Sequence, residues 1–157
     1  MKVVYPLSIF HKKGVFLPNM ARDKIHTPVK EALIDDGWLV TDDPLYMKVG
    51  NLPIFIDLGA ERVFGAEKDD ERIAVEVKTF GNPSFITALY EAVGKYVVYR
   101  KALRLEESDR TLYLAMPEDV YIRYSAEPLF IGTLEDENVN LILFETDIEK
   151  ITKWIKR

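Results

Sequence analysis

Apolar residues recur at helical spacing in two parts of the chain. Between residues 23 and 36 the apolar positions lie three or four residues apart, and Gly37 follows them as a stop signal. The longest predicted helix covers residues 84–105 and starts at Ser84, a residue type that caps helix N-termini. The pattern therefore predicts one helix near the beginning of the chain and a longer one in its middle.

Short apolar runs predict the strands between and after these helices. They cover residues 38–41, 46–49, 52–58, 72–78, 111–116 and 139–144. A short helical segment is expected between the last two strands, and the pattern of residues 148–155 fits either a helix or an edge strand. This order predicts an α/β fold in which a mixed β-sheet is flanked by helices.

Composition narrows the function classes. The chain has 157 residues and no cysteine, which excludes disulfide scaffolds, cysteine-ligated metal sites and thiol catalysis. Its net charge of -5 argues against a general binder of polyanions. Charge is unevenly distributed, since residues 84–104 hold four basic residues and one acidic residue, whereas residues 105–149 hold two and twelve. Solvated faces explain such a distribution, and a locally positive surface is the alternative.

No targeting or membrane segment is predicted. The apolar residues near the start of the chain are interrupted by Pro6 and followed by His11, Lys12 and Lys13, without the small-residue cleavage site of a signal peptide. No run approaches the roughly 18 apolar residues that a bilayer-spanning helix requires. We therefore expect a soluble, cytoplasmic protein with no membrane partner.

Charged side chains interrupt two of the apolar strands. In RIAVEVK, Glu76 and Lys78 share one face, because side chains alternate across a strand. In LPIFIDL, Ile56 and Leu58 are expected on one face and Asp57 on the opposite face. If the two strands are neighbours, Asp57 and Glu76 converge, with Lys78 beside them.

This set of residue types is suited to phosphodiester hydrolysis. Two carboxylates on rigid strands can hold Mg²⁺, which prefers oxygen ligands and keeps several waters. The ion polarises a phosphoryl oxygen and lowers the pKa of a bound water, while a lysine positions that water or offsets charge on the phosphate. The alternative is structural, since a Glu-x-Lys triplet is common and also fits an edge strand with a cross-strand salt bridge.

Several segments together resemble the XisH family, the fdxN-element excision controlling factors found chiefly in cyanobacteria. The resemblance runs from Met20 nearly to the end of the chain. It is carried by ARDKIHTPVKEALIDDGW, DPLYMKV, LPIFIDLGAER, IAVEVKTF, AVGKYVVYR, LYLAMPEDVY and the final KWI. The family is similar to the PD-(D/E)XK nuclease superfamily, which has a restriction-endonuclease-like core. The catalytic motif of that superfamily falls here on Asp57, Glu76 and Lys78, with Asp57 and Glu76 as the metal ligands.

The resemblance also implies supporting residues. Related nucleases often carry Gln-x-x-x-Tyr on the helix after the motif, and here Tyr99 is kept while Lys95 stands in the place of the glutamine. A lysine there can still hold a phosphate. Glu31, on the first helix, corresponds to an extra metal ligand of some nucleases in the superfamily, and solvent exposure is the alternative reading of that residue.

Two functions are consistent with these residues. The first is a DNA endonuclease that depends on Mg²⁺ or Mn²⁺ and acts in programmed DNA excision. The second is a non-catalytic accessory factor on the same fold, which regulates a recombinase or pairs with XisI. DNA and an XisI-type protein are the implied partners, and a homodimer is a further candidate assembly.

Family members usually begin near the Met-Ala-Arg-Asp sequence that starts here at Met20. We therefore expect a single XisH-like domain over residues 20–157. Residues 1–19 are an N-terminal extension, and whether they are a native part of the domain is left open.

Overall fold

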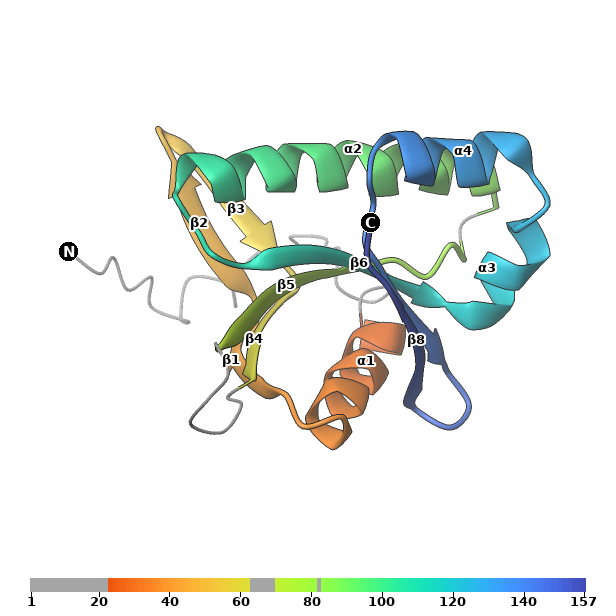
Figure 1. Cartoon of the computed structure of the whole chain (residues 1–157), viewed down its shortest axis with the longest axis horizontal. Helices are drawn as coiled ribbons and strands as arrows, with labels where there is room; N and C mark the ends of the chain where they lie inside the picture. Colours follow the sequence, from red (N-terminus) through yellow and green to blue (C-terminus); the bar gives the residue numbers. More distant parts are fainter. Residues whose placement is uncertain (1–22, 63–69, 82) are drawn as a thin grey trace, which may run out of the picture.

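The computed structural model describes residues 23–62, 70–81 and 83–157 (Figure 1). The predicted extension, residues 1–19, lies outside them. The described helices are α1 (Asp23–Asp35), α2 (Phe85–Leu105), α3 (Glu118–Tyr124) and α4 (Pro128–Asp136). The described strands are β1 (Leu39–Asp42), β2 (Leu45–Val49), β3 (Leu52–Ile56), β4 (Leu58–Arg62), β5 (Glu71–Val77), β6 (Thr111–Pro117), β7 (Leu141–Glu145) and β8 (Lys150–Ile155).

Six of these strands form one mixed sheet in the order β1-β4-β5-β6-β7-β8. The central strands β5, β6 and β7 are parallel, and the outer pairs are antiparallel. Parallel neighbours need crossover connections, which α2 provides between β5 and β6, and α3 and α4 between β6 and β7. The predicted α/β class, with a mixed sheet flanked by helices, is thereby confirmed.

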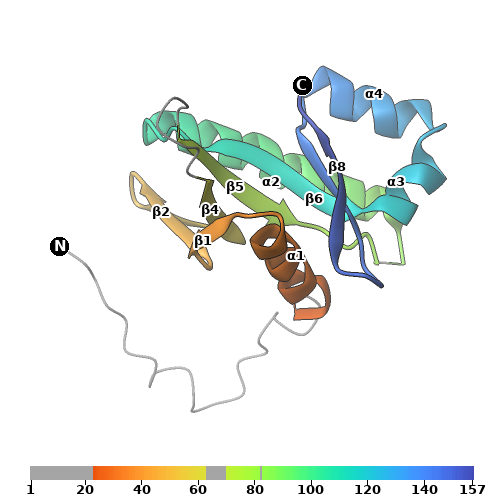
Figure 2. The same ribbon diagram turned by 60° about the horizontal axis from the view of Figure 1, so that its bottom comes forward.

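Helices cover both faces of the sheet, with α2 and α1 on opposite sides (Figures 1 and 2). Because side chains alternate along a strand, β5 contributes to both cores. Ala74 packs in the core beneath α2, whereas Ile73 and Val75 pack in the core beside α1. The central strands are therefore covered on both faces, as their nearly continuous apolar sequences predict.

The long central helix begins and ends close to its predicted bounds. The Ser84 hydroxyl accepts a hydrogen bond from the Thr87 backbone N–H at 3.2 Å and so caps α2. None of the helices in the described part of the chain is long and apolar enough to cross a bilayer.

The predicted strand 52–58 is wrong as a single element. The chain leaves the two-stranded sheet of β2 and β3 after Ile56, passes through Asp57, and enters the large sheet as β4. Consequently Ile56 lies in the core beneath α2, and Leu58 lies in the core beside α1, so the two do not share a face. Strand β4 was not predicted, and residues 148–155, which fitted two elements, contain the strand β8.

Helix α4 offers a matched test of the core beneath α2. Leu134 is fully buried, whereas Leu129 on the same helix is 64% exposed. We expect Leu134→Ala to lower the free energy of unfolding by about 2–5 kcal/mol, because it removes apolar contacts and leaves a cavity. Leu129→Ala should change it by less than about 0.5 kcal/mol. Urea unfolding of both variants measures the difference, and equal effects would contradict the described packing.

Candidate functional site

The candidate site lies where β5 passes beneath α2. Glu76 is only 3% exposed, and its register partner is Leu114 of the parallel strand β6. Lys78 follows on the same face, just after the end of β5, where its backbone N–H donates to the Ala115 carbonyl at 2.9 Å. The pairing of β5 and β6 thus continues to Lys78, and the predicted alternation holds both side chains toward α2.

Asp57 reaches this position because it occupies the break between β3 and β4. Its Oδ2 accepts a hydrogen bond from the Val77 backbone N–H at 2.9 Å. The backbone of Asp57 in turn donates toward the Glu76 carboxylate. The structure therefore places Asp57 beside Glu76, with Lys78 two residues further along the same face, and it does so through a strand break rather than one continuous strand.

Helix α2 supplies the opposite charges. The Lys95 Nζ lies 3.2 Å from the Glu76 Oε1, and the Lys78 ammonium pairs with the Glu91 carboxylate. Glu91 and Lys95 are one helical turn apart, so they lie on the same side of α2. We call Asp57, Glu76, Lys78, Glu91 and Lys95 the carboxylate–lysine cluster.

Burial controls the proton affinity of Glu76. Loss of hydration raises its pKa from the ordinary value of 4.5 to about 7, and the negative charge of Asp57 adds to the rise. Lys95 and the Asp57 backbone act in the opposite direction. Glu91 is exposed, and its ion pair with Lys78 lowers its pKa. The surroundings therefore raise the pKa of Glu76 and lower the pKa of Glu91.

Of the remaining predicted residues, Tyr99 lies on α2 near the cluster and Glu31 lies on the opposite side of the sheet. Tyr99, one turn after Lys95 on α2, is half-buried against the core beneath that helix. Glu31 is exposed on α1, which covers the opposite face of the sheet, so the structure does not bring it to the cluster. Glu91 was not predicted as a site residue. The signal for it was present, because it is the one acidic residue in the basic segment 84–104.

The chemistry of the cluster fits a hard divalent cation held by few protein ligands. Among the described residues, no group of three or more His, Cys, Asp or Glu side chains could enclose a metal ion. Asp57 and Glu76 offer two carboxylates, which suits Mg²⁺ or Mn²⁺, since Mg²⁺ sites commonly combine one or two carboxylates with waters. The Lys95 ammonium occupies the Oε1 side of Glu76, so it competes with a cation for that oxygen.

The fold and the cluster define an α/β protein in which a buried carboxylate on the mixed sheet pairs with a lysine on the long helix above it. The chain belongs to the XisH family, because the family model described as XisH protein matches residues 19–152. The resemblance inferred from the sequence segments is thereby confirmed.

Two crystal structures are similar to this chain. An XisH family protein from Nostoc punctiforme PCC 73102 is 35% identical, with a TM-score of 0.77, over 85% of this chain and 100% of that chain. A fdxN element excision controlling factor protein from Anabaena variabilis is 36% identical, with a TM-score of 0.77, over 86% of this chain and 100% of that chain. No curated protein matches the chain.

The raised pKa of Glu76 predicts an unusual pH dependence of stability. Between about pH 4.5 and 7 the folded protein holds a proton on Glu76 that the unfolded chain has released. Stability from this group is therefore fully present below pH 4.5 and falls as pH rises toward 7, by up to about 1.4 kcal/mol per pH unit.

Urea unfolding of the wild type and Glu76→Gln between pH 4.5 and 8, with EDTA present, measures this effect. The stability of the wild type relative to the variant should decrease as pH rises through the window, because glutamine does not titrate. A difference that stays constant over the window would contradict the assignment of a raised pKa to Glu76.

Proposed function

We propose that this chain is a metal-dependent nuclease that hydrolyses DNA phosphodiester bonds at the carboxylate–lysine cluster. The observation that carries the proposal is the almost fully buried Glu76 carboxylate with the negative charge of Asp57 beside it and Lys78 two residues further along the same strand face. Burying a carboxylate is costly, so a fold keeps one where its chemistry is used or where a network needs it. The order Asp, Glu-x-Lys also matches the motif of the PD-(D/E)XK superfamily.

In this proposal Asp57 and Glu76 hold Mg²⁺ or Mn²⁺. The bound ion supplies Lewis-acid polarisation of a phosphoryl oxygen and a water of lowered pKa. Lys78 orients the attacking water or offsets charge on the phosphate. Lys95, which is half-exposed, releases the Glu76 Oε1 and is free to contact a phosphate oxygen of the substrate. Tyr99 supports the helix position from which Lys95 acts.

The biological role that we propose is control of DNA excision. The similar protein from Anabaena variabilis is described as a fdxN element excision controlling factor. Membership of the same family supports the same role for this chain, with DNA and an XisI-type protein as partners and the cytoplasm as its location. Copurification with an XisI-type protein, with the chain alone as reference, tests the partner independently of cleavage.

A non-catalytic accessory factor is the second candidate. The observation that favours it is the internal pairing of the cluster, since Glu76 contacts Lys95 and Lys78 contacts Glu91. Such a network satisfies its own charges and serves as a structural connection between β5 and α2. On this alternative the chain binds DNA or a protein partner without cleaving, because fold and motif similarity alone do not establish chemistry.

The first prediction from the proposal concerns the metal. Isothermal titration of the wild type with Mg²⁺ and Mn²⁺ should show binding that Asp57→Asn and Glu76→Gln each abolish, because the amides keep the shape and remove the ligand charge. Glu31→Gln is a matched control on the opposite side of the sheet and should bind like the wild type. Absence of wild-type binding at millimolar concentrations would remove the main support for a nuclease.

The second prediction concerns Lys78. Lys78→Met retains the apolar stem of the side chain and removes only its charge. If Lys78 acts in catalysis, DNA cleavage should fall on the order of a hundredfold or more, while metal binding persists. Lys101→Met, at an exposed position of α2, is the control and should cleave normally.

Plasmid nicking and cleavage of duplex, junction and single-stranded DNA with Mg²⁺ or Mn²⁺ measure these rates. Unchanged cleavage by Lys78→Met would exclude the proposed mechanism. A wild type that binds DNA or an XisI-type protein, but cleaves none of these substrates, would establish the accessory factor instead.

A further inference from the structure

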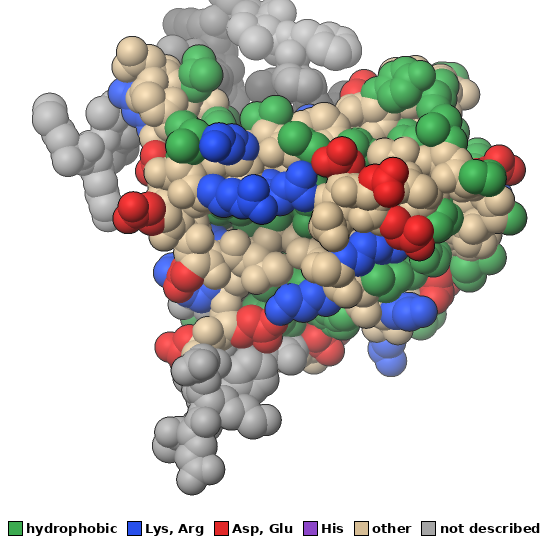
Figure 3. All heavy atoms as spheres, turned by 45° about the horizontal axis from the view of Figure 1, so that its top comes forward, with side chains coloured by type: hydrophobic (Ala, Val, Ile, Leu, Met, Phe, Trp, Pro, Cys, Tyr) green, Lys and Arg blue, Asp and Glu red, His purple; other side chains and the backbone are tan. Residues whose placement is uncertain are grey.

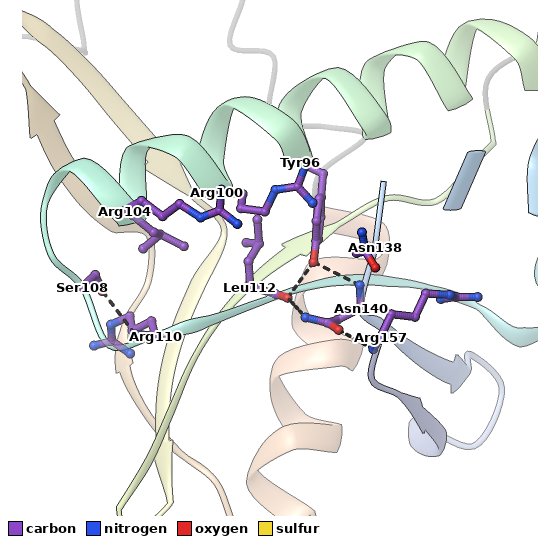
Figure 4. Close-up of a pocket in the computed structure, with 10 residues that line it drawn as sticks. Tyr96, Arg100, Arg104, Ser108, Arg110, Leu112, Asn138, Asn140 and Arg157 are labelled. Carbon is purple, nitrogen blue, oxygen red and sulfur yellow. Dashed lines mark hydrogen bonds between the residues drawn. The ribbon is translucent and has the colours of Figure 1, made fainter. Parts of the chain in front are cut away.

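A polar pocket lies between the C-terminal half of α2, the start of β6 and the end of the chain (Figure 4). Its volume is about 430 Å³, and its lining includes Arg100, Arg104, Arg110 and Arg157. None of the lining side chains in the described part of the chain is acidic. Figure 3 shows lysine and arginine side chains gathered in a band across the face that α2 crosses. We call this the arginine pocket.

A buried hydrogen-bond network forms the floor of the arginine pocket. The Tyr96 hydroxyl donates to the Leu112 carbonyl at 3.0 Å and accepts from the Asn140 backbone N–H at 3.0 Å. The Asn140 amide also donates to Leu112, and its oxygen accepts from the Arg157 backbone N–H at 2.8 Å. The Tyr96 hydroxyl is protonated at neutral pH and can donate, and burial raises its pKa further above the ordinary value. This network fixes the end of the chain against α2.

Two of the four arginines are committed to the fold by carboxylates. Arg110 donates to the carbonyls of Ala60 and Ile73 and to the Asp42 carboxylate, and its side chain is 7% exposed. Arg100 donates to the carbonyl and the carboxylate of Glu137. These two residues therefore build the pocket wall, and side-chain charge largely balances them.

The other two arginines have spare capacity for a ligand. Arg157 donates through Nη1 to the Val139 carbonyl at 2.7 Å, which uses one of its five side-chain donors. Arg104 is exposed in the last turn of α2, and among the described residues it has no ion-pair partner. The pocket thus holds positive charge that no side-chain carboxylate balances.

The arginine pocket is separate from the carboxylate–lysine cluster. Arg104 follows Lys95 by nine residues, which is half a turn more than two full helical turns, or about 180° in direction. Lys95 and Arg104 therefore project from opposite flanks of α2. The residues that line the arginine pocket do not include those of the carboxylate–lysine cluster, so a ligand in the pocket does not occupy the cluster.

We propose that the arginine pocket binds the phosphate group of a nucleotide or of a nucleic-acid strand, with Arg104 as its main contact. Guanidinium groups match phosphate oxygens because their donors lie in a planar fork that can bind two oxygens at once. The volume is within the range of small-molecule sites and exceeds what a lone phosphate fills. The lining thus favours a phosphate attached to a larger unit, and it would repel basic ligands.

Binding of three probes to the full chain in EDTA tests this proposal without involving a metal. The probes are a fluorescent 12-nucleotide single-stranded DNA, a deoxynucleoside monophosphate and inorganic phosphate, the last two as competitors and in direct titrations. Arg104→Gln should weaken binding at least tenfold, because it removes charge-assisted hydrogen bonds to the phosphate. The affinity of Arg104→Lys should lie between that of the wild type and that of Arg104→Gln, because lysine keeps a point charge and loses the planar fork of donors.

Arg123→Gln is the matched control, since it removes one positive charge from an exposed arginine on α3 that pairs with Asp119. It should change affinity less than twofold. Binding of the monophosphate identifies a nucleotide site, whereas binding of DNA alone identifies a strand site, and either supports the proposal if Arg104→Gln weakens it.

Three outcomes would overturn the proposal. They are unchanged affinity in Arg104→Gln, equal losses in Arg104→Gln and Arg123→Gln, and no binding of any probe by the wild type at millimolar concentrations. None of these outcomes depends on cleavage, so the proposed nuclease function and the arginine pocket can fail separately.

Discussion

Burial of the Glu76 carboxylate is the constraint on which the site depends. A carboxylate that is 3% exposed has lost most of its hydration, and the surrounding groups must replace that water. The Lys95 ammonium and the backbone of Asp57 do so in part, yet the pKa of Glu76 still rises to about 7. The register of α2 over β5 is therefore tied to the site, because a shift of the helix would leave a buried charge without its partner.

Local periodicity in the sequence predicted two parts of this arrangement, namely the faces of β5 and the bounds of α2. Ile73 and Val75 define the buried face of β5 beside α1, and an alternation with a period of two leaves only the opposite face for Glu76 and Lys78. The α2 helix was equally predictable, since Ser84 caps it and no proline interrupts it before Leu105. Where one buried strand face or one helix cap determines an element, the amino-acid sequence alone is enough to predict that element.

The break at Asp57 could not be predicted from the same periodicity. Ile56 and Leu58 are both fully buried on either side of Asp57, and their spacing also fits one continuous strand in which Asp57 alternates to the opposite face, so the periodicity does not show that the chain changes sheets there. Which sheet a strand joins depends on partners distant in sequence, here β2 for β3, and β1 and β5 for β4. The pairing of Lys95 with Glu76 and of Lys78 with Glu91 likewise depends on how α2 lies across β5, which propensity does not specify.

A proton and the Lys95 ammonium compete for the Glu76 carboxylate, and the two candidate functions differ in whether a divalent ion competes with both. A proton binds it up to about pH 7, the Lys95 ammonium contacts it at 3.2 Å, and the proposed divalent ion would need it ionised. In an accessory factor, Lys95 and the proton suffice, and the cluster connects strand to helix. In a nuclease, the ion must displace both, and Lys95 is well suited to yield, because its half-exposed ammonium regains water when it leaves. The exposure of Lys95 therefore makes the same buried carboxylate compatible with catalysis, which a fully buried ion pair would oppose.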